Sequence, residues 1–261
     1  MSLSTEKPIP FNTEMVKAIL DGIKTQTRRP IKIKNKLTRD WAETSGVDWI
    51  KVNLEDEKYP YSIREQNGVW NEYSLDDFIK KYSKYKVGDI LWVREPAKII
   101  GNHKQIGNIY ERTCNFKYLA DDKIIEDFNI PYRFSSLHIN QFLYKNLKGT
   151  WLTGDKGIPN GCIKEMARIF LKVTNVRVER LQDISDEDCI KEGIVEVTKD
   201  NQVFKFCIYD KKDYSSTPWQ DMPRNPQKVY KKLWNSIAKD GYKWEDNPYV
   251  FVYEFERLTN D

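Results

Sequence analysis

Residues 24–29 place a lysine, two threonines and two arginines within six positions, a density of charged and hydroxyl groups typical of a binding site. Positions 22–39 hold seven basic residues and no acidic one, although the whole chain has 43 Lys and Arg against 39 Asp and Glu. The excess positive charge is therefore local. A local positive field beside small hydroxyl groups favours an anionic ligand, and we expect a nucleotide or a nucleic acid.

The composition is that of a globular protein. The 261 residues are 39% hydrophobic and 13% aromatic, which is enough to bury a core. A net charge of +4 is too small for a protein that coats nucleic acid along its whole surface. Binding of an anion should therefore be confined to a patch and should weaken as the salt concentration rises.

The sequence indicates neither a metal site nor a membrane segment. The four cysteines are widely spaced without a C-x-x-C pair, and His103 and His138 are the only imidazoles, which argues against a zinc site. We expect no metal and no cofactor. There is no signal peptide and no apolar run near the ~18 residues of a membrane span, so we expect a cytoplasmic protein with reduced thiols.

The segment 24–29 is expected to connect a helix to a strand. Thr13 can cap a helix with apolar residues at helical spacing, and Gly22 can end it in a left-handed cap. After Pro30, the alternation of isoleucine and lysine at 31–34 predicts a strand with one basic face.

Other regular elements follow along the chain. The Ser185-x-x-Asp188 pattern predicts a short capped helix that Gly193 ends, so that Glu192 stands in its last turn. Further helices are expected at 75–82 and 226–238, and strands at 87–95, at 168–174 and 175–179 with a turn or bulge at 174–175, and at 249–255.

The pattern of elements predicts an α+β fold, and we expect one domain over residues 4–258. Three weakly patterned stretches separate the regular elements, at about 36–85, 101–162 and 195–226. We interpret them as insertions. Their many tyrosines and tryptophans could pack the insertions themselves or could cover nucleobases.

Five blocks of sequence occur in a characteristic order: 20–29 (LDGIKTQTRR), 87–95 (VGDILWVRE), 173–181 (VTNVRVERL), 186–193 (DEDCIKEG) and 247–255 (NPYVFVYEF). Together they resemble the ASCH domain, and in particular its long phage and prophage members. The chain departs from those members at Pro96 and Ala97, where they have a threonine followed by an aromatic residue. The resemblance implies a PUA-like fold, a small and strongly curved β-barrel with short helices and a cleft suited to RNA or a modified nucleoside.

The resemblance also implies a chemistry. A small bacterial branch of ASCH proteins hydrolyses the acetyl group from N(4)-acetylcytidine. It uses a lysine as proton acceptor, a threonine three residues later as nucleophile, and a glutamate in the helix after the central strands as proton donor. Lys24, Thr27 and Glu192 match these three catalytic positions.

The local sequence is compatible with those roles. A threonine hydroxyl needs a neighbouring base, and a lysine can be that base only if its pKa falls well below ~10.4. Arg28 and Arg29 should lower the pKa of Lys24, because like charges disfavour the protonated amine. The negative end of the helix dipole favours a protonated Glu192, although the dipole alone contributes only about 0.3–1 kcal/mol.

Each candidate residue also has a purely structural interpretation. Lys24 and Thr27 could simply link a helix to a strand, Glu192 could be a solvated helix end, and the arginines could form a solvated basic face. Trp92 could be a core residue and Glu95 could pair with a neighbouring cation. In the binding interpretation the residues that contact the ligand are Thr25, Arg28, Arg29, Trp92 and Glu95.

Two classes of function are therefore expected, and the fold alone does not decide between them. The first is a binding module that holds RNA, a nucleotide or a modified nucleoside in the barrel cleft without breaking a bond. The second is an amidohydrolase acting on N(4)-acetylcytidine-like nucleosides, which requires Lys24, Thr27 and Glu192 to converge. A third, less specific expectation is a phage accessory protein whose insertions bind a host protein. The resemblance places the protein in the cytoplasm of a bacterial host, encoded by a phage or prophage.

Overall fold

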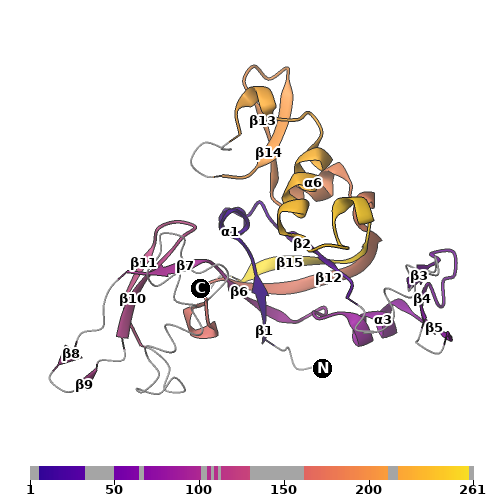
Figure 1. Ribbon diagram of the computed structural model, residues 1–261, viewed down its shortest axis with the longest axis horizontal. Helices are drawn as coiled ribbons and strands as arrows, with labels where there is room; N and C mark the ends of the chain where they lie inside the picture. Colours follow the sequence, from indigo (N-terminus) through magenta and orange to yellow (C-terminus); the bar gives the residue numbers. More distant parts are fainter. Residues whose placement is uncertain are drawn as a thin grey trace.

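The computed structural model describes residues 6–32, 50–64, 68–100, 105–106, 109–110, 113–129, 162–210 and 217–258. In these ranges the chain is α+β, as predicted, with strands predominating. The centre is a five-stranded sheet in the order β1 (Glu6–Pro10), β6 (Ile90–Arg94), β12 (Phe170–Arg180), β15 (Tyr249–Leu258) and β2 (Gln26–Pro30) (Figure 1). β1 runs parallel to β6, and the other neighbours are antiparallel.

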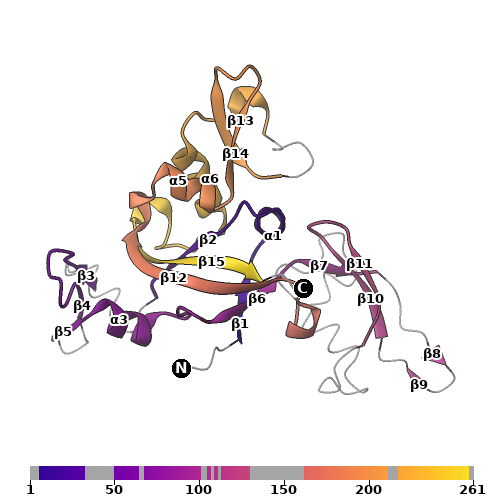
Figure 2. The same cartoon turned by 180° about the vertical axis from the view of Figure 1, so that it is seen from behind.

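The long pair β12 and β15 gives the sheet its shape. The two strands pair over the whole length of β12, with a register shift between Val173 and Asn175. The bulge predicted at 174–175 is thus confirmed, but it lies inside one continuous strand. A bulge bends and twists the strand that contains it, and both strands curve strongly in Figures 1 and 2.

The helices lie on both sides of this sheet. α1 (Thr13–Leu20), α5 (Asp186–Lys191) and α6 (Pro226–Ile237) lie above it in Figure 1, and α3 (Leu75–Tyr82) lies below it. The buried apolar core joins α1, α3 and α6 to the central strands. Short 3-10 turns occupy Lys164–Met166, Leu181–Asp183, Trp219–Asp221 and Trp244–Asp246. None of the helices in the described ranges has the length and apolar character needed to cross a membrane.

The three stretches interpreted as insertions contain regular structure of their own. Figures 1 and 2 show small sheets that project away from the central one. They are formed by β3 (Ile50–Val52), β4 (Tyr61–Arg64) and β5 (Trp70–Tyr73); by β7 (Ala97–Ile99), β10 (Thr113–Tyr118) and β11 (Ile124–Asn129); by β8 (Gln105–Ile106) and β9 (Ile109–Tyr110); and by β13 (Ile194–Thr198) and β14 (Phe204–Ile208).

Several predicted boundaries are confirmed and others are corrected. The helices at 75–82 and after Ser185 form as expected, and α6 ends within one residue of its predicted end. The residue that caps α1 is Asn12 and not Thr13, because the Asn12 side chain accepts the amide of Met15 at 2.9 Å. A strand, β2, ends at Pro30; of the strand expected at 31–34, residues 31 and 32 are not in a strand, and residues 33 and 34 lie outside the described residues.

The edges of the central sheet differ most from expectation. β1 was not predicted, because Pro8 and Pro10 lack amide hydrogens and are tolerated only in edge strands. Among the described residues no backbone pairing joins β1 to β2, so these strands form an open, curved sheet and not a closed barrel. The two edges nevertheless approach each other, because the Arg29 side chain donates a hydrogen bond to the Pro10 carbonyl at 2.8 Å.

Candidate functional site

The segment between α1 and β2 docks against the end of α5. Gly22 adopts a positive φ of 74° and turns the chain, after which the Thr25 amide donates to the Lys191 carbonyl at 3.0 Å. Lys24 then donates from Nζ to the Glu192 carboxylate at 2.6 Å and to the Glu192 carbonyl at 2.8 Å. Both side chains are buried, so the structure brings two of the three predicted catalytic residues into direct contact.

The pKa of Lys24 is lowered, in the direction that the sequence predicted. Burial of the amine is the largest cause, because burial disfavours its charged form. The ion pair with Glu192 opposes this shift, and the charges of Arg29 and Arg28 contribute smaller lowering effects. The arginines are therefore a minor cause of a shift that burial dominates.

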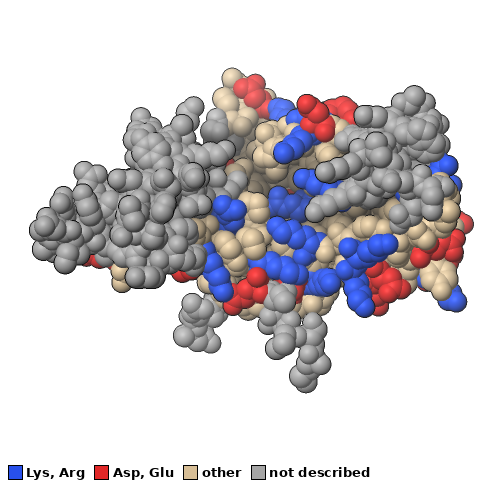
Figure 3. Space-filling model, turned by 60° about the horizontal axis from the view of Figure 1, so that its bottom comes forward, with Lys and Arg blue, Asp and Glu red and all other residues tan. Residues whose placement is uncertain are grey.

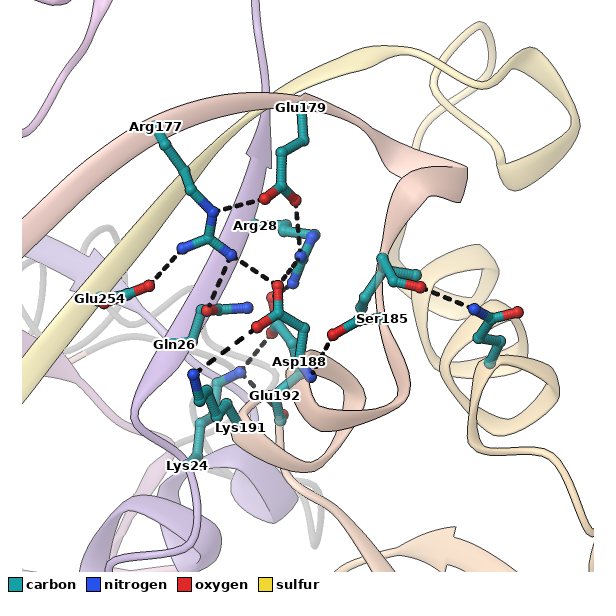
Figure 4. A network of polar contacts seen from close by, with 12 residues as sticks. Lys24, Gln26, Arg28, Arg177, Glu179, Ser185, Asp188, Lys191, Glu192 and Glu254 are labelled. Atoms are coloured by element: carbon teal, nitrogen blue, oxygen red, sulfur yellow. Dashed lines mark hydrogen bonds and ion pairs between the residues drawn. The ribbon is translucent and has the colours of Figure 1, made fainter.

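Lys24 and Glu192 belong to a larger set of buried and half-buried charges, which we call the buried charge network. Figure 4 shows its side chains pointing toward one another from β2 and the segment before it, from β12 and β15, and from α5 and the residue after it. Arg28 binds Asp188 at 2.5 Å, Glu179 at 2.8 Å and Glu192 at 3.3 Å. The members of the network are Lys24, Arg28, Arg177, Glu179, Asp188, Glu192 and Glu254.

Arg177 completes the network on its outer side. Its guanidinium binds Glu179 at 2.5 Å, Asp188 at 2.6 Å and also Glu254. The guanidinium of Arg28 is in turn enclosed by three carboxylates, and its side chain has no exposed surface. Arg28 was predicted to contact a ligand, but its terminal nitrogens are already occupied within the protein.

Thr27 lies outside this network. Successive residues of a strand face opposite sides, so Thr27 and Arg28 point in opposite directions from β2. Thr27 is buried and pairs in register with Tyr253 of β15. In the described structure no hydrogen bond joins the Thr27 hydroxyl to Lys24 or to Glu192. The structure therefore joins the predicted base and acid but not the predicted nucleophile.

A cavity of about 610 Å³ lies beside β2, and we call it the basic cavity. In the described part of the chain, its lining includes five basic and six aromatic residues and no acidic one. The walls come from β2 and the turn after it, from the end of α3, from α6 and from β15. The lining residues are Pro10, Arg28, Arg29, Pro30, Lys32, Tyr82, Ser83, Lys84, Tyr85, Trp234, Ile237, Ala238, Lys239, Tyr242, Phe251 and Tyr253.

Four of the five cations that line the basic cavity, Arg29, Lys32, Lys84 and Lys239, have no carboxylate partner among the described residues. Arg28 is the one lining cation that pairs with carboxylates of the described residues. Arg29 instead donates to the Pro10 carbonyl and lies 5.2 Å from the centre of the Phe11 ring. Figure 3 shows a face of the molecule across whose middle Lys and Arg side chains gather.

The remaining predicted ligand contacts lie elsewhere. Thr25 is exposed and does not line the cavity, and Trp92 is half-buried in β6 beside Pro8 and Phe170 in register. Glu95 is fully buried and accepts two hydrogen bonds of 2.9 Å from Arg168, which also binds Asp121. Burial raises the pKa of Glu95 and Arg168 opposes that shift. The ion-pair interpretation of Glu95 is thus the one the geometry supports.

The sequence left several functional positions unrecognised. Arg177 and Glu179 lie two residues apart in β12, which places them on one face of an otherwise apolar strand, and that spacing was a usable signal. Tyr85, Trp234 and Tyr253 have no such signal, because an aromatic residue in a cavity wall looks like a core residue. His103 and His138 lie outside the described residues, and within the described ranges no group of His, Cys, Asp and Glu could hold a metal ion.

No family model, no curated protein and no solved structure matches this chain. The resemblance to ASCH domains thus depends on the five sequence blocks, and the function has to be argued from the geometry and charge of the site.

Proposed function

We propose that the protein binds a nucleotide or a single-stranded nucleic acid in the basic cavity. The observation that carries the proposal is that, among the described residues, the lining has six aromatic side chains, no carboxylate, and four cations that lie outside the buried charge network: Arg29, Lys32, Lys84 and Lys239. Cations attract phosphate, and aromatic side chains stack on nucleobases of any sequence. A cavity of about 610 Å³ has the size of a small-molecule site, so it suits a nucleotide unit rather than a duplex.

The contrast between paired and unpaired cations supports this assignment. Buried charges are normally paired within the protein, as Lys24 and Arg28 are. Arg29, Lys32, Lys84 and Lys239 line one cavity without a carboxylate among them, which leaves their charge available to an anion from outside. The strongly curved sheet and the contact between Arg29 and Pro10 across its open edge also support a PUA-like fold, which remains part of the proposal.

Fluorescence anisotropy with a short labelled single-stranded RNA tests the proposal. We expect binding at low salt that weakens as salt rises, and we expect Arg29→Gln to weaken it by about 10-fold, since a hydrogen bond to a charged group contributes about 1.5–3 kcal/mol. Lys80 provides a matched control, because it is exposed on α3 and does not line the cavity. Absence of binding at low salt, or equal weakening by Arg29→Gln and Lys80→Gln, would contradict the proposal.

One observation favours amidohydrolysis as a second candidate function. Lys24 and Glu192 lie 2.6 Å apart and are buried together, and the pKa of Lys24 is lowered. Transfer of one proton from Lys24 to Glu192 within this pair would create a neutral amine as base and a carboxylic acid as proton donor. The two groups that the reaction needs would then be in contact.

The reaction would add one water across the amide bond of an N(4)-acylated cytidine. The Thr27 oxygen would attack the acyl carbon while its proton passes to Lys24, and the cytosine amine would leave with a proton from Glu192. Water would then release the acid from Thr27. Because Lys24 is bonded to Glu192 and not to Thr27, this candidate requires the pair to rearrange around the substrate.

Incubation with N(4)-acetylcytidine, followed by chromatography for cytidine and acetate, tests the second candidate. Thr27→Val keeps the shape of the side chain and removes the nucleophile, so it should abolish release of cytidine. Lys24→Ala should do the same, and the circular dichroism spectrum shows whether either variant has lost its fold. No release by the wild type, or equal release by wild type and Thr27→Val, would exclude this mechanism.

A further inference from the structure

We infer that Arg29 and Lys84 form a phosphate subsite in the basic cavity, so that the ligand class is a nucleotide with a terminal phosphate and not a free nucleoside. This inference deepens the proposed function and depends on it. Three observations support it: both side chains donate hydrogen bonds to carbonyls of β1, neither has a carboxylate partner among the described residues, and a third cation, Arg94, lies close to them.

The two cations are held side by side along one strand. Arg29 of β2 donates to the Pro10 carbonyl at 2.8 Å, and Lys84, just after α3, donates to the Pro8 carbonyl at 3.4 Å. Pro8 and Pro10 are alternate residues of the edge strand β1, so their carbonyls are separated by about 6.6 Å along it. Two cations that donate to carbonyls at that spacing are close enough for each to bind a different oxygen of one phosphate.

Arg94 adds a third positive charge at the same place. It lies directly opposite Pro10 in the register of β1 and β6, and its Nε is buried without a hydrogen-bond partner. Burial, followed by the charges of Arg29, Arg94 and Lys7, lowers the pKa of Lys84. Lys7 is neutralised by Asp89 at 2.6 Å, whereas the other three cations have no carboxylate partner among the described residues.

Because Arg29, Lys84 and Arg94 have no carboxylate partner among the described residues, a bound anion would relieve the repulsion between them. A phosphate monoester carries about two negative charges at neutral pH, whereas a diester inside a strand carries one. A cluster of three unpaired cations therefore favours the monoester. The aromatic walls of the same cavity select a phosphate that carries a base over inorganic phosphate.

Isothermal titration calorimetry with cytidine, adenosine, their 5′-monophosphates and inorganic phosphate tests the subsite. We expect each monophosphate to bind at least 10-fold more tightly than its nucleoside, and inorganic phosphate to compete weakly. Lys84→Gln should weaken monophosphate binding by about 10-fold and nucleoside binding by much less, because a charge-assisted hydrogen bond to the phosphate is lost. Lys84 is exposed, so this variant should fold normally, and Arg29→Gln provides a second test.

The possible outcomes separate the subsite from the broader function. Equal affinity for nucleosides and monophosphates would overturn the subsite and leave nucleotide binding intact. Binding of single-stranded RNA without binding of any monophosphate would also overturn it. Failure of every probe to bind would contradict the proposed function itself. Lys80→Gln removes the same charge outside the cavity, and an equal loss in that variant would show that the effect is nonspecific and overturn the subsite.

Discussion

Glu192 is the residue on which two buried cations depend. Its carboxylate binds Lys24 at 2.6 Å and Arg28 at 3.3 Å. Among the described residues it is the only carboxylate that pairs with Lys24. Loss of one partner of a buried ion pair typically costs about 3–5 kcal/mol, because the other charge is left uncompensated. We expect Glu192→Gln to lower the free energy of unfolding by about 3 kcal/mol.

The converse substitution should cost less. Lys24→Met removes the buried amine and leaves Glu192 paired with Arg28, which has two further carboxylate partners. Urea denaturation of both variants at neutral pH measures the difference. Equal losses, or a larger loss for Lys24→Met, would show that Arg28 does not compensate for the missing lysine.

Asp188 should make stability depend on acid pH. Burial tends to raise the pKa of its carboxyl, but hydrogen bonds and charge from Arg28, together with the charge of Arg177, lower the pKa below the usual 3.8. A carboxyl whose pKa is lower in the folded state stabilises the fold at pH values above its pKa in the unfolded state. This contribution is lost as the pH falls through the pKa of the folded state. The difference in unfolding free energy between wild type and Asp188→Asn should therefore be constant above about pH 5 and should shrink below 3.8. Urea denaturation from pH 7 to pH 3 measures it, and an unchanged difference at pH 3 would contradict the expectation.

At the scale of elements, two glycines end the helices that position Lys24 and Glu192. Gly22 has a φ of 74° and an added Cβ would meet no atom within 4 Å, whereas Gly193 has a φ of 101° and its Cβ would lie 3.4 Å from that of Ala18. A left-handed conformation costs an alanine about 1–2 kcal/mol, and a φ near 100° lies beyond the small region that alanine tolerates. We expect Gly193→Ala to destabilise the protein by at least about 1 kcal/mol more than Gly22→Ala.

Thermal and urea denaturation of the two glycine variants provide the comparison. Both substitutions add the same methyl group after a helix. The difference between their losses of unfolding free energy therefore measures the effects of the backbone conformation at Gly193 and of its packing against α1. A smaller effect at Gly193 would mean that the end of α5 can adjust without moving Lys24 from Glu192.

The elements that could be predicted are those with local signals. α3 and α6 have one apolar face, and α5 has Ser185 and Gly193 at its two ends. β1 could not be predicted from its own residues, because its prolines are tolerated only by virtue of its place at the sheet edge. β2 was missed because its residues were interpreted as the link between a helix and a strand. Arg28 is buried by carboxylates from β12 and α5 that are more than 150 positions away, which no local pattern indicates.

At the scale of the whole molecule, positive charge is divided between two places with different roles. The buried charge network pairs its cations internally, and the proximity of Lys24 and Glu192 within it was expected only through the resemblance to ASCH domains. The basic cavity could not be predicted, because its wall joins residues as distant in sequence as Arg29, Lys84 and Lys239. Only the folded sheet and helices bring their unpaired charges together.

The salt dependence of RNA binding should show how many phosphates the cations of the cavity neutralise. The logarithm of the affinity for a single strand falls with the logarithm of salt concentration with a slope of about −0.7 for each phosphate neutralised. Arg29, Lys32, Lys84 and Lys239 are the lining cations without carboxylate partners among the described residues, so we expect a slope no steeper than about −3. Anisotropy titrations at several salt concentrations measure this slope.

Arg29→Gln should make the slope shallower by about 0.7 and Lys80→Gln should leave it unchanged. A much steeper slope that is insensitive to Arg29→Gln would mean that the nucleic acid is held by basic residues outside the cavity.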